Sequence, residues 1–169
     1  MTAKHALIIG ASRGLGLGLV KELLKDGWKV TATVRDLQKA QALKSLGQVN
    51  IEQLDMDNYQ AIKALSNTLN NQVFDLLFIN AGIKGPDDQW SGNATLAEVG
   101  QLFYTNSVAP INLAKEFVSK IRKDSGVLAF MSSVLGSIAV PDAPEMALYK
   151  ASKAALNSMT NTFVHHELG

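Results

Sequence analysis

The sequence of 169 residues contains no cysteine, which excludes disulfide bonds and thiolate metal sites. Its three histidines, His5, His165 and His166, are too few and too scattered to indicate a metal cluster. The formal net charge of +1 gives no electrostatic reason to expect a nucleic-acid partner, which normally requires a basic patch. No apolar run approaches the ~20 residues that span a bilayer, and the N-terminus lacks the apolar stretch of a secretory signal. We therefore expect a cytoplasmic globular protein without a metal ion, a nucleic-acid partner or a membrane partner.

Short apolar runs rich in β-branched residues alternate with longer stretches whose apolar residues have helical spacing. The expected strands are Ala6–Ile9, Lys29–Val34, Val49–Leu54, Phe74–Ile79 and Val127–Met131. Alternation of strands and helices predicts a parallel sheet, and continuous apolar strands indicate burial on both faces. With right-handed crossovers, the fold class is α/β: a Rossmann-like, doubly wound parallel sheet with helices on both faces. No linker or repeat interrupts residues 1–169, which we expect to form one domain.

The segments between the strands supply the expected helices and loops. The first helix carries Leu19 and Leu23 and ends before Gly27, a typical C-terminal stop. The later helices are expected at Ala61–Leu69, Leu102–Ile121 and Ala147–Val164. Loops at Lys84–Asn93 and Val140–Pro144 follow the fourth and fifth strands, so we expect them at the carboxyl edge of the sheet, where such folds bind ligands.

Gly10, Gly14 and Gly16 follow the first strand and open the first helix. Glycine permits a sharp turn and a close approach of the backbone to a ligand, and a helix N-terminus presents free N–H groups to a pyrophosphate. Glycines also collect in tight turns that bind nothing, but the position between a strand and a helix favours a dinucleotide site.

The end of the second strand bears on the choice of cofactor. A basic residue there accommodates a 2′-phosphate, whereas an acidic residue binds the ribose diol. Arg35 comes first and Arg13 lies inside the glycine turn, which favours NADP. Asp36 is the counter-argument, because a shift of one residue would direct it at the ribose, and a solvated loop charge is the other interpretation of Arg35.

Tyr149 and Lys153 lie four residues apart, on one face of the last helix. A lysine cation ~4 Å away stabilises a phenolate by about 4 kcal/mol at an effective dielectric of 20, so such a pair can act as an acid–base unit. Tyr59 and Lys63 have the same spacing, but we expect them to form a solvated surface pair. Tyr149 differs because it follows the fifth strand, whose end carries a serine pair that can donate to a carbonyl oxygen.

These motifs, in this order, resemble the short-chain dehydrogenase/reductase family over nearly the whole chain. The segment Gly10–Gly16 resembles the cofactor-binding turn of the family, and Asp55 resembles the residue that contacts the adenine ring. Asn80-Ala81-Gly82 resembles the N-A-G signature of the family. Its catalytic residues match Ser133, Tyr149, Lys153 and Asn106. The run Ser132–Ile138 is similar to carbonyl reductases of the C-factor/sniffer type.

The resemblance implies NADP as the cofactor, with NAD second, and a small carbonyl or alcohol as the substrate. The residues expected to contact the cofactor are Gly10, Ser12, Arg13, Gly14, Leu15, Gly16, Arg35, Asp55, Met56, Asn80, Ala81, Gly82, Tyr149 and Lys153.

The resemblance also implies a role for each catalytic residue. Tyr149 exchanges a proton with the substrate oxygen, and Lys153 stabilises the ionised tyrosine and holds the nicotinamide ribose. Ser133 orients the carbonyl, and the backbone of Asn106 holds a water in a proton relay. Pro110, one turn later, is compatible with a local kink.

Several residues also have plainer interpretations. Ser132 is the alternative catalytic serine, and both serines could cap the strand–loop junction. Asn80 and Asn106 could be ordinary turn or helix polar groups. Asp55 could be a helix N-cap, although Asp57 is better placed for that. The last helix also carries the small residues Ala151, Ser152, Ala155 and Ser158. They could simply fill space, or they could form a homo-oligomer surface, which the family makes through the helices that bear Asn106 and Tyr149.

The chain ends at Gly169, at the end of the helix that carries Tyr149, whereas the family continues through further strands and a mobile loop. We therefore expect an N-terminal portion in which the fifth strand is an exposed edge and turnover is impaired. The alternative function is a non-catalytic or signalling protein that uses the reductase fold to bind a cofactor or a partner.

Overall fold

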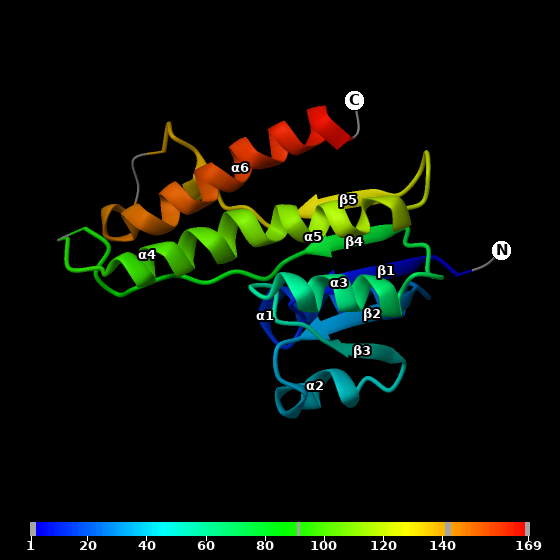
Figure 1. Cartoon of the computed structure of the whole chain (residues 1–169). Helices are drawn as coiled ribbons and strands as arrows, with labels where there is room; N and C mark the ends of the chain where they lie inside the picture. The colour runs from blue at the N-terminus through cyan, green and yellow to red at the C-terminus, as the bar shows by residue number, and fades with distance from the viewer. Residues whose placement is uncertain (1–2, 91, 141–142, 168–169) are drawn as a thin grey trace. The chain divides into compact units, whose positions relative to one another are not determined.

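The computed structural model of the chain describes residues 3–90, 92–140 and 143–167 (Figure 1). Ser91, Pro141 and Asp142, which belong to the two expected loops, and the chain end at Leu168 and Gly169 lie outside the described residues. The chain forms two compact units. A sheet unit comprises the chain up to Ala81 together with Glu116–Met131, and a helical unit comprises Gly82–Lys115 together with the chain from Ser132 onward.

The sheet unit contains five parallel strands in the order β3-β2-β1-β4-β5 (Figure 1). The strands are β1 (His5–Ile9), β2 (Lys29–Val34), β3 (Val49–Gln53), β4 (Leu76–Ile79) and β5 (Val127–Phe130). The strand order reverses between β1 and β4, and ligands of doubly wound sheets bind at the carboxyl ends of the strands at such a point. The predicted α/β fold class is confirmed.

The central strand β1 is buried along its whole length, as its uninterrupted apolar run predicts for a strand covered on both faces. Ile8 pairs with Ala32 on one side and with Phe78 on the other. All five strands occur where the sequence predicts them, with ends that differ by two residues at most. Phe74, expected in the fourth strand, forms only an isolated bridge with Ile121.

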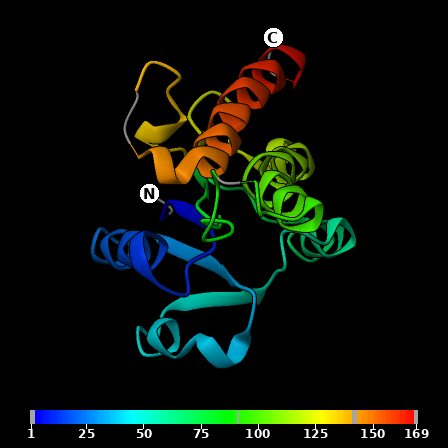
Figure 2. The same ribbon diagram turned by 90° about the vertical axis from the view of Figure 1, so that its left-hand side faces the viewer.

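The α-helices in the described part of the sheet unit are α1 (Gly14–Lys25), α2 (Gln41–Lys44) and α3 (Tyr59–Thr68). The short α2 was not predicted from the sequence. Figure 2 shows α1 and α3 on opposite faces of the sheet, as right-handed crossovers in opposite directions require. Gly27, at φ +76°, ends α1 as predicted: its amide donates to Leu24, and the amide of Trp28 donates to Leu23.

The N-cap of α3 corrects one expectation. Asn58, not Asp57, occupies this position, and its side-chain oxygen accepts the amides of Gln60 and Ala61 at 3.0 and 3.2 Å. Asn and Asp cap equally well, so the choice depends on which residue has the extended backbone of an N-cap.

The helical unit contains α4 (Leu96–Phe103), most of α5 (Ala109–Phe117) and α6 (Ala147–Glu167). The helix expected from Leu102 to Ile121 begins earlier, because Thr95 and Glu98 form a capping box at the start of α4. A π-helical segment, Tyr104–Val108, separates α4 from α5, and the expected kink near Pro110 takes this form. Among the described residues, no helix is both long and apolar enough to cross a membrane.

Candidate active site

The glycine turn of the sheet unit adopts backbone conformations that side chains rarely accept. Gly10 and Gly14 have φ values of +83° and +57°. A Cβ atom at Gly10 would lie 2.8 Å from the Cβ atom of Ala81, so the turn packs directly against the segment after β4. Gly16 is equally constrained, since a Cβ there would overlap the carbonyl oxygen of Gly10 and lie 2.8 Å from the amide nitrogen of Asn80. Gly10 and Gly16 are thus required because a side chain would clash with neighbouring atoms, and Gly14 is required because of its positive φ.

Hydrogen bonds from neighbouring strands hold this turn in place. The side-chain amide of Asn80 donates to the Gly10 carbonyl at 2.8 Å. The amide of Gly10 donates to the hydroxyl of Thr33 at 3.1 Å, and the amide of Ala11 donates to the carbonyl of Thr33 at 2.9 Å. Thr33 was not predicted as a site residue, because its partners lie more than twenty positions away in the chain.

The start of α1 suits an anion. Arg13 is the N-cap residue, and its side chain makes no hydrogen bond to the helix. The first amides of a helix lack partners within the helix, and they attract phosphate groups. Together with the close packing at Gly10 and Gly16, this geometry fits the pyrophosphate of a dinucleotide. Ser12 is half-buried in the turn, whereas Leu15 is exposed on the first turn of α1.

The end of β2 separates Arg35 from Asp36. The strand ends at Val34, so the exposed Arg35 is the first residue beyond it. Asp36 instead serves as the N-cap of the next turn, and its carboxylate accepts the amide of Gln38 at 2.9 Å. Because β2 ends at Val34, the shift of one residue that would direct Asp36 at the ribose does not occur.

The residues after β3 lie near the same edge. Asp55 is exposed and accepts the amide of Asp57 at 3.1 Å, while Met56 is buried.

In the helical unit, Tyr149 and Lys153 occupy one face of α6. The Lys153 ammonium nitrogen lies 5.9 Å from the centroid of the Tyr149 ring. Lys153 is only 3% exposed, and burial lowers the pKa of its ammonium group below the ordinary value for lysine. Buried ionisable side chains of this kind mark functional sites more often than surface pairs do.

The matching pair in the sheet unit differs in its surroundings. Lys63 also lies 5.9 Å from the ring of Tyr59, but Lys63 is exposed and Tyr59 is 40% exposed. The Tyr59 hydroxyl donates to the Glu116 carboxylate at 2.5 Å, and this hydrogen bond raises the pKa of Tyr59. The prediction of a surface pair is confirmed.

Asn106 lies in the π-helical segment and is fully buried. Its side-chain oxygen accepts the amide of Ile83 at 2.9 Å, and its side-chain nitrogen donates to the carbonyl of Ile83 at 2.8 Å. The same nitrogen donates to the Ser152 hydroxyl at 3.1 Å. Asn106 therefore fixes the segment after Gly82 and connects it to α6.

Ser152 corrects the expectation that it is filler or part of an exposed helix surface. It is fully buried, and its hydroxyl donates to the carbonyl of Tyr149 at 2.7 Å. The hydroxyl of Ser107 donates to the carbonyl of Ser152, also at 2.7 Å. Ser152 lies between the tyrosine and the lysine in sequence, and this position was the signal that could have identified it.

Ser132 and Ser133 make different contacts. Ser132 donates to the side-chain oxygen of Asn157 on α6 at 2.6 Å. Ser133 accepts the amide of Leu135 at 3.1 Å, which uses an oxygen lone pair and leaves the hydroxyl proton able to donate. The amide of Asn157 also contacts the carbonyl of Gly136 at 3.3 Å. Asn157 thus connects the serine turn to α6, a role that its place in the sequence does not indicate.

Gly82, Asn106 and Lys153 meet in the helical unit. A Cβ atom at Gly82 would lie 3.2 Å from the Asn106 side-chain oxygen and 3.4 Å from the Lys153 ammonium nitrogen. Within the described part of the chain, no group of three histidine, aspartate or glutamate side chains could hold a metal ion. The polar groups that this unit offers for chemistry are the Tyr149 phenol, the buried Lys153 ammonium and the Ser133 hydroxyl.

Comparison with known proteins identifies the family. The model of the short chain dehydrogenase family matches residues 4–168. The chain belongs to the short-chain dehydrogenases. It is similar to a carbonyl reductase from Pseudomonas aeruginosa crystallised in complex with NADP, with 35% identity and a TM-score of 0.91 over 97% of this chain and 73% of that one.

Two further proteins are somewhat less similar. The carbonyl reductase Sniffer of Drosophila melanogaster has 30% identity and a TM-score of 0.85, over 97% of this chain and 75% of that one. An uncharacterized oxidoreductase of Schizosaccharomyces pombe is 31% identical over 92% of this chain. The chain spans 64% of the length of that curated relative, which is less than two thirds.

Proposed function

We propose that this short-chain dehydrogenase is an NADP(H)-dependent oxidoreductase that interconverts a carbonyl and an alcohol. The observation that carries the proposal is the buried Lys153 ammonium, 5.9 Å from the Tyr149 ring centroid and beside Asn106. A cation held out of water stabilises a nearby phenolate far more than a solvated one does, which lets the tyrosine exchange a proton near neutral pH.

The residues of the sheet unit fit the cofactor. Gly10, Gly14, Gly16 and the N-terminus of α1 would hold the pyrophosphate, and Arg35 would pair with the 2′-phosphate. Asp55, Met56, Asn80 and Ala81 are further members of the proposed set in this unit. The cofactor, when bound, supplies or accepts the hydride at the substrate carbon. The NADP complex of the Pseudomonas aeruginosa relative supports this choice of cofactor.

The proposed roles of the side chains follow from their chemistry. During reduction, Ser133 donates a hydrogen bond to the carbonyl oxygen and polarises the carbonyl bond. Tyr149 then transfers its phenolic proton to that oxygen, while Lys153 stabilises the phenolate that remains. Asn106 acts by holding Ile83 and Ser152, and through them the positions of Gly82 and Tyr149.

The test is NADPH oxidation by the purified chain against a panel of aldehydes, ketones and quinones. We expect Tyr149→Phe to reduce kcat by about a hundredfold or more, because positioned proton transfer contributes 10²–10⁴-fold. Tyr59→Phe is the matched control, since it removes the hydroxyl from the equivalent surface pair, and it should leave kcat unchanged. Equal measurable rates in the parent and Tyr149→Phe would reject the tyrosine mechanism. A parent chain that binds NADPH but reduces none of the substrates would instead favour a non-catalytic binding function.

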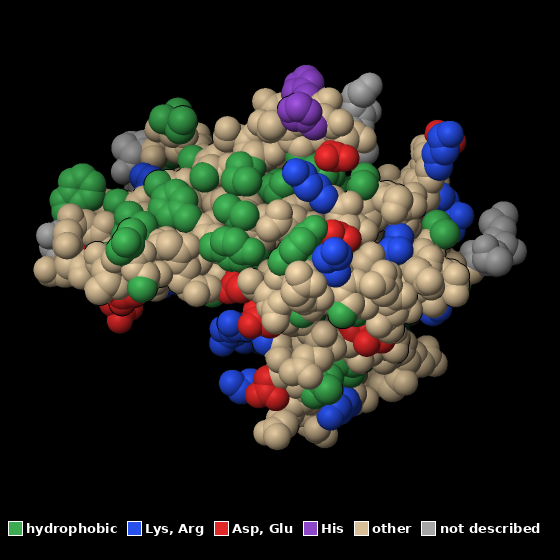
Figure 3. Space-filling model, in the orientation of Figure 1, with side chains coloured by type: hydrophobic (Ala, Val, Ile, Leu, Met, Phe, Trp, Pro, Cys, Tyr) green, Lys and Arg blue, Asp and Glu red, His purple; other side chains and the backbone are tan. Residues whose placement is uncertain are grey.

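We further propose a cytoplasmic homo-oligomer that associates through the helices bearing Asn106 and Tyr149. Hydrophobic side chains gather over the region of α4 on the face shown in Figure 3. Leu96, the first residue of α4, is 89% exposed, and Trp90 is also largely exposed. Contiguous exposed apolar side chains are typical of protein–protein contacts.

A further inference from the structure

We infer that Gln89 is a positioning residue that couples the loop after Gly82 to the backbone of the proton donor, Tyr149. The inference deepens the proposed function and rests on it. Gln89 is only 6% exposed, although it lies in an irregular segment outside any helix or strand. A buried polar side chain in a loop is uncommon unless its hydrogen bonds are satisfied, and here they are.

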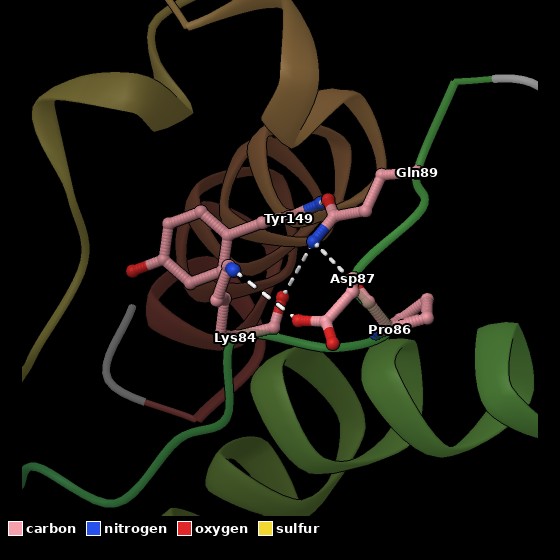
Figure 4. A network of polar contacts seen from close by, with 5 residues as sticks. All are labelled: Lys84, Pro86, Asp87, Gln89 and Tyr149. Atoms are coloured by element: carbon pink, nitrogen blue, oxygen red, sulfur yellow. Dashed lines mark hydrogen bonds and ion pairs between the residues drawn. The ribbon is translucent and has the colours of Figure 1, made fainter.

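The primary amide of Gln89 uses its donors and its acceptor within the helical unit (Figure 4). Its nitrogen donates to the carbonyls of Lys84 and Pro86, each at 3.0 Å. Its oxygen accepts the backbone amide of Tyr149 at 2.8 Å. The two carbonyls require donors and the backbone amide requires an acceptor, so these partners fix the orientation of the Gln89 amide.

This contact acts at a weak point of α6. Tyr149 lies in the first turn of the helix, where backbone amides have no partner within a regular helix. Gln89 supplies that partner from a position 60 residues earlier in the chain. On the other side, Ser152 donates to the Tyr149 carbonyl at 2.7 Å. The backbone of Tyr149 is therefore held at both its N–H and its C=O.

The consequence concerns where the phenol lies. Without the Gln89 contact, the first turn of α6 can fray or rotate, and the Tyr149 side chain moves with it. The same amide also closes the loop on itself through Lys84 and Pro86, so the loop and the tyrosine shift together. The exposed ion pair between Lys84 and Asp87, at 3.6 Å, adds little to this link.

The chemistry of an amide suggests the decisive variants. In Gln89→Glu, a carboxylate would face two carbonyl oxygens, which is unfavourable unless the new side chain is protonated. In Gln89→Met, all three hydrogen bonds are lost while the size is nearly kept. Gln101→Glu is the matched control, because Gln101 is exposed on α4 in the same unit and undergoes the same change in charge. Its side-chain nitrogen donates to the Thr105 hydroxyl at 2.9 Å, and a hydroxyl can donate to a carboxylate in return, so this contact survives the change.

Two measurements test the inference. First, the hydrogen exchange of the Tyr149 amide in Gln89→Met should be at least tenfold faster than in the parent, while the core of α6 near Leu156 keeps its protection. Second, the kcat of Gln89→Glu for carbonyl reduction should fall about tenfold at pH 8 and recover towards pH 6. The charged groups close in sequence to the two ends of this contact are Lys84, Asp87 and Asp88 of the loop and Glu145, Lys150 and Lys153 around Tyr149. The Gln101→Glu variant retains all of them.

The outcomes separate the two proposals. Unchanged exchange of the Tyr149 amide in Gln89→Met, or a Gln89→Glu variant that matches Gln101→Glu at every pH, would overturn the role of Gln89. A parent chain that reduces no carbonyl substrate counts against the proposed function, whereas the exchange result still decides whether Gln89 holds Tyr149. Should Gln89→Met not fold, the exchange of the Tyr149 amide is measured on Gln89→Glu and on the parent at pH 6 and again at pH 8. Relative to the parent at the same pH, the variant should exchange at least tenfold faster at pH 8 and nearly equally at pH 6, and equal rates at both pH values would overturn the role of Gln89.

Discussion

The ammonium nitrogen of Lys153 lies 5.9 Å from the ring centroid of Tyr149, and Lys153 is almost entirely removed from solvent. Lys63 stands at the same distance from Tyr59, but on an exposed surface of α3. The pairs share their sequence spacing and this distance, whereas their burial and their neighbouring groups differ. The chain thus contains its own control for the acid–base pair.

Substitution of the two lysines tests this difference. Lys153→Met should reduce kcat by about a hundredfold or more, because the phenolate loses a poorly screened cation. Lys63→Met should leave kcat unchanged, because a solvated pair contributes little. Steady-state reduction of one aldehyde by both variants measures the contrast. Equal kcat losses in both variants would contradict this account.

The pH dependence of the parent chain gives a second expectation for Lys153. Burial lowers the pKa of Lys153, so kcat should begin to fall on the alkaline side at a lower pH than it would with a lysine of ordinary pKa.

The glycine turn predicts opposite effects at two glycines of α1. Gly16→Ala should weaken NADPH binding at least tenfold and lower the free energy of unfolding by about 1–3 kcal/mol, because its Cβ meets Gly10 and Asn80. Gly18→Ala places its Cβ in open space within the helix, and it should raise the free energy of unfolding by about 0.5–1 kcal/mol. Fluorescence titration with NADPH and urea unfolding measure both quantities. A Gly16→Ala variant that binds like the parent would refute the close-packed turn.

Arg35 should determine the preference for NADPH over NADH. A hydrogen bond to a charged phosphate contributes about 1.5–3 kcal/mol, so Arg35→Ala should raise the Kd for NADPH about 10- to 100-fold. The Kd for NADH should stay constant, because NADH lacks the 2′-phosphate. Lys39→Ala, another exposed cation after β2, controls for the general loss of positive charge. Equal affinities of the parent chain for the two cofactors would contradict the assignment.

His5 should make the stability depend on pH. It is 6% exposed, its ring nitrogen lies 2.9 Å from the Thr31 hydroxyl, and burial, with a smaller effect of Lys29, lowers the pKa of His5 to about 4. In the unfolded chain, His5 takes up its proton near pH 6.5, whereas in the folded chain it does so only at about pH 4. The contribution of His5 to the free energy of unfolding is therefore fully present above pH 6.5 and decreases by about 3 kcal/mol as the pH falls to about 4.

Urea unfolding between pH 7 and pH 4 measures this decrease. His5→Gln should remove most of the slope in that interval. His165→Gln, which changes an exposed histidine of α6, should leave it. An identical slope in the parent and His5→Gln would assign the effect to other groups.

The exposed Leu96 offers a test of self-association. Leu96→Glu should shift the chain towards the monomer, because it places a charge in the apolar region of α4. Leu37→Glu changes an exposed leucine of the sheet unit and serves as the control. Sedimentation velocity at several concentrations would show the difference, and a monomeric parent would reject the proposed oligomer.

Much of the sheet unit can be read from local sequence. The bounds of β2 and the stop at Gly27 follow from apolar runs and from one glycine, because both depend on neighbours in the chain. The glycine turn and the Tyr149–Lys153 spacing are local for the same reason. The expected cap, Asp57, is wrong by one residue, because adjacent Asp and Asn cap equally well and only the backbone geometry, which composition does not reveal, selects Asn58.

The residues that support the site were not predictable in this way. Gln89, Thr33 and Asn157 each contact partners more than twenty positions away, and nothing in their immediate sequence marks them. Ser152 has the small size of a filler residue, and only the fold shows that its hydroxyl connects Asn106 to Tyr149. Chemistry-bearing residues follow short motifs, whereas the groups that orient them depend on tertiary contacts.

The π-helical segment Tyr104–Val108 changes which residues of α4 and α5 lie on the same face. A π-turn contains one residue more than an α-turn, so α5 is out of phase with α4 by roughly 100° compared with one continuous helix. This shift allows three successive residues, Thr105, Asn106 and Ser107, to be buried together. A helical wheel drawn through Leu96–Phe117 therefore assigns one of its halves to the wrong face. The length of this segment, and not only the identity of Asn106, is a constraint on the chain.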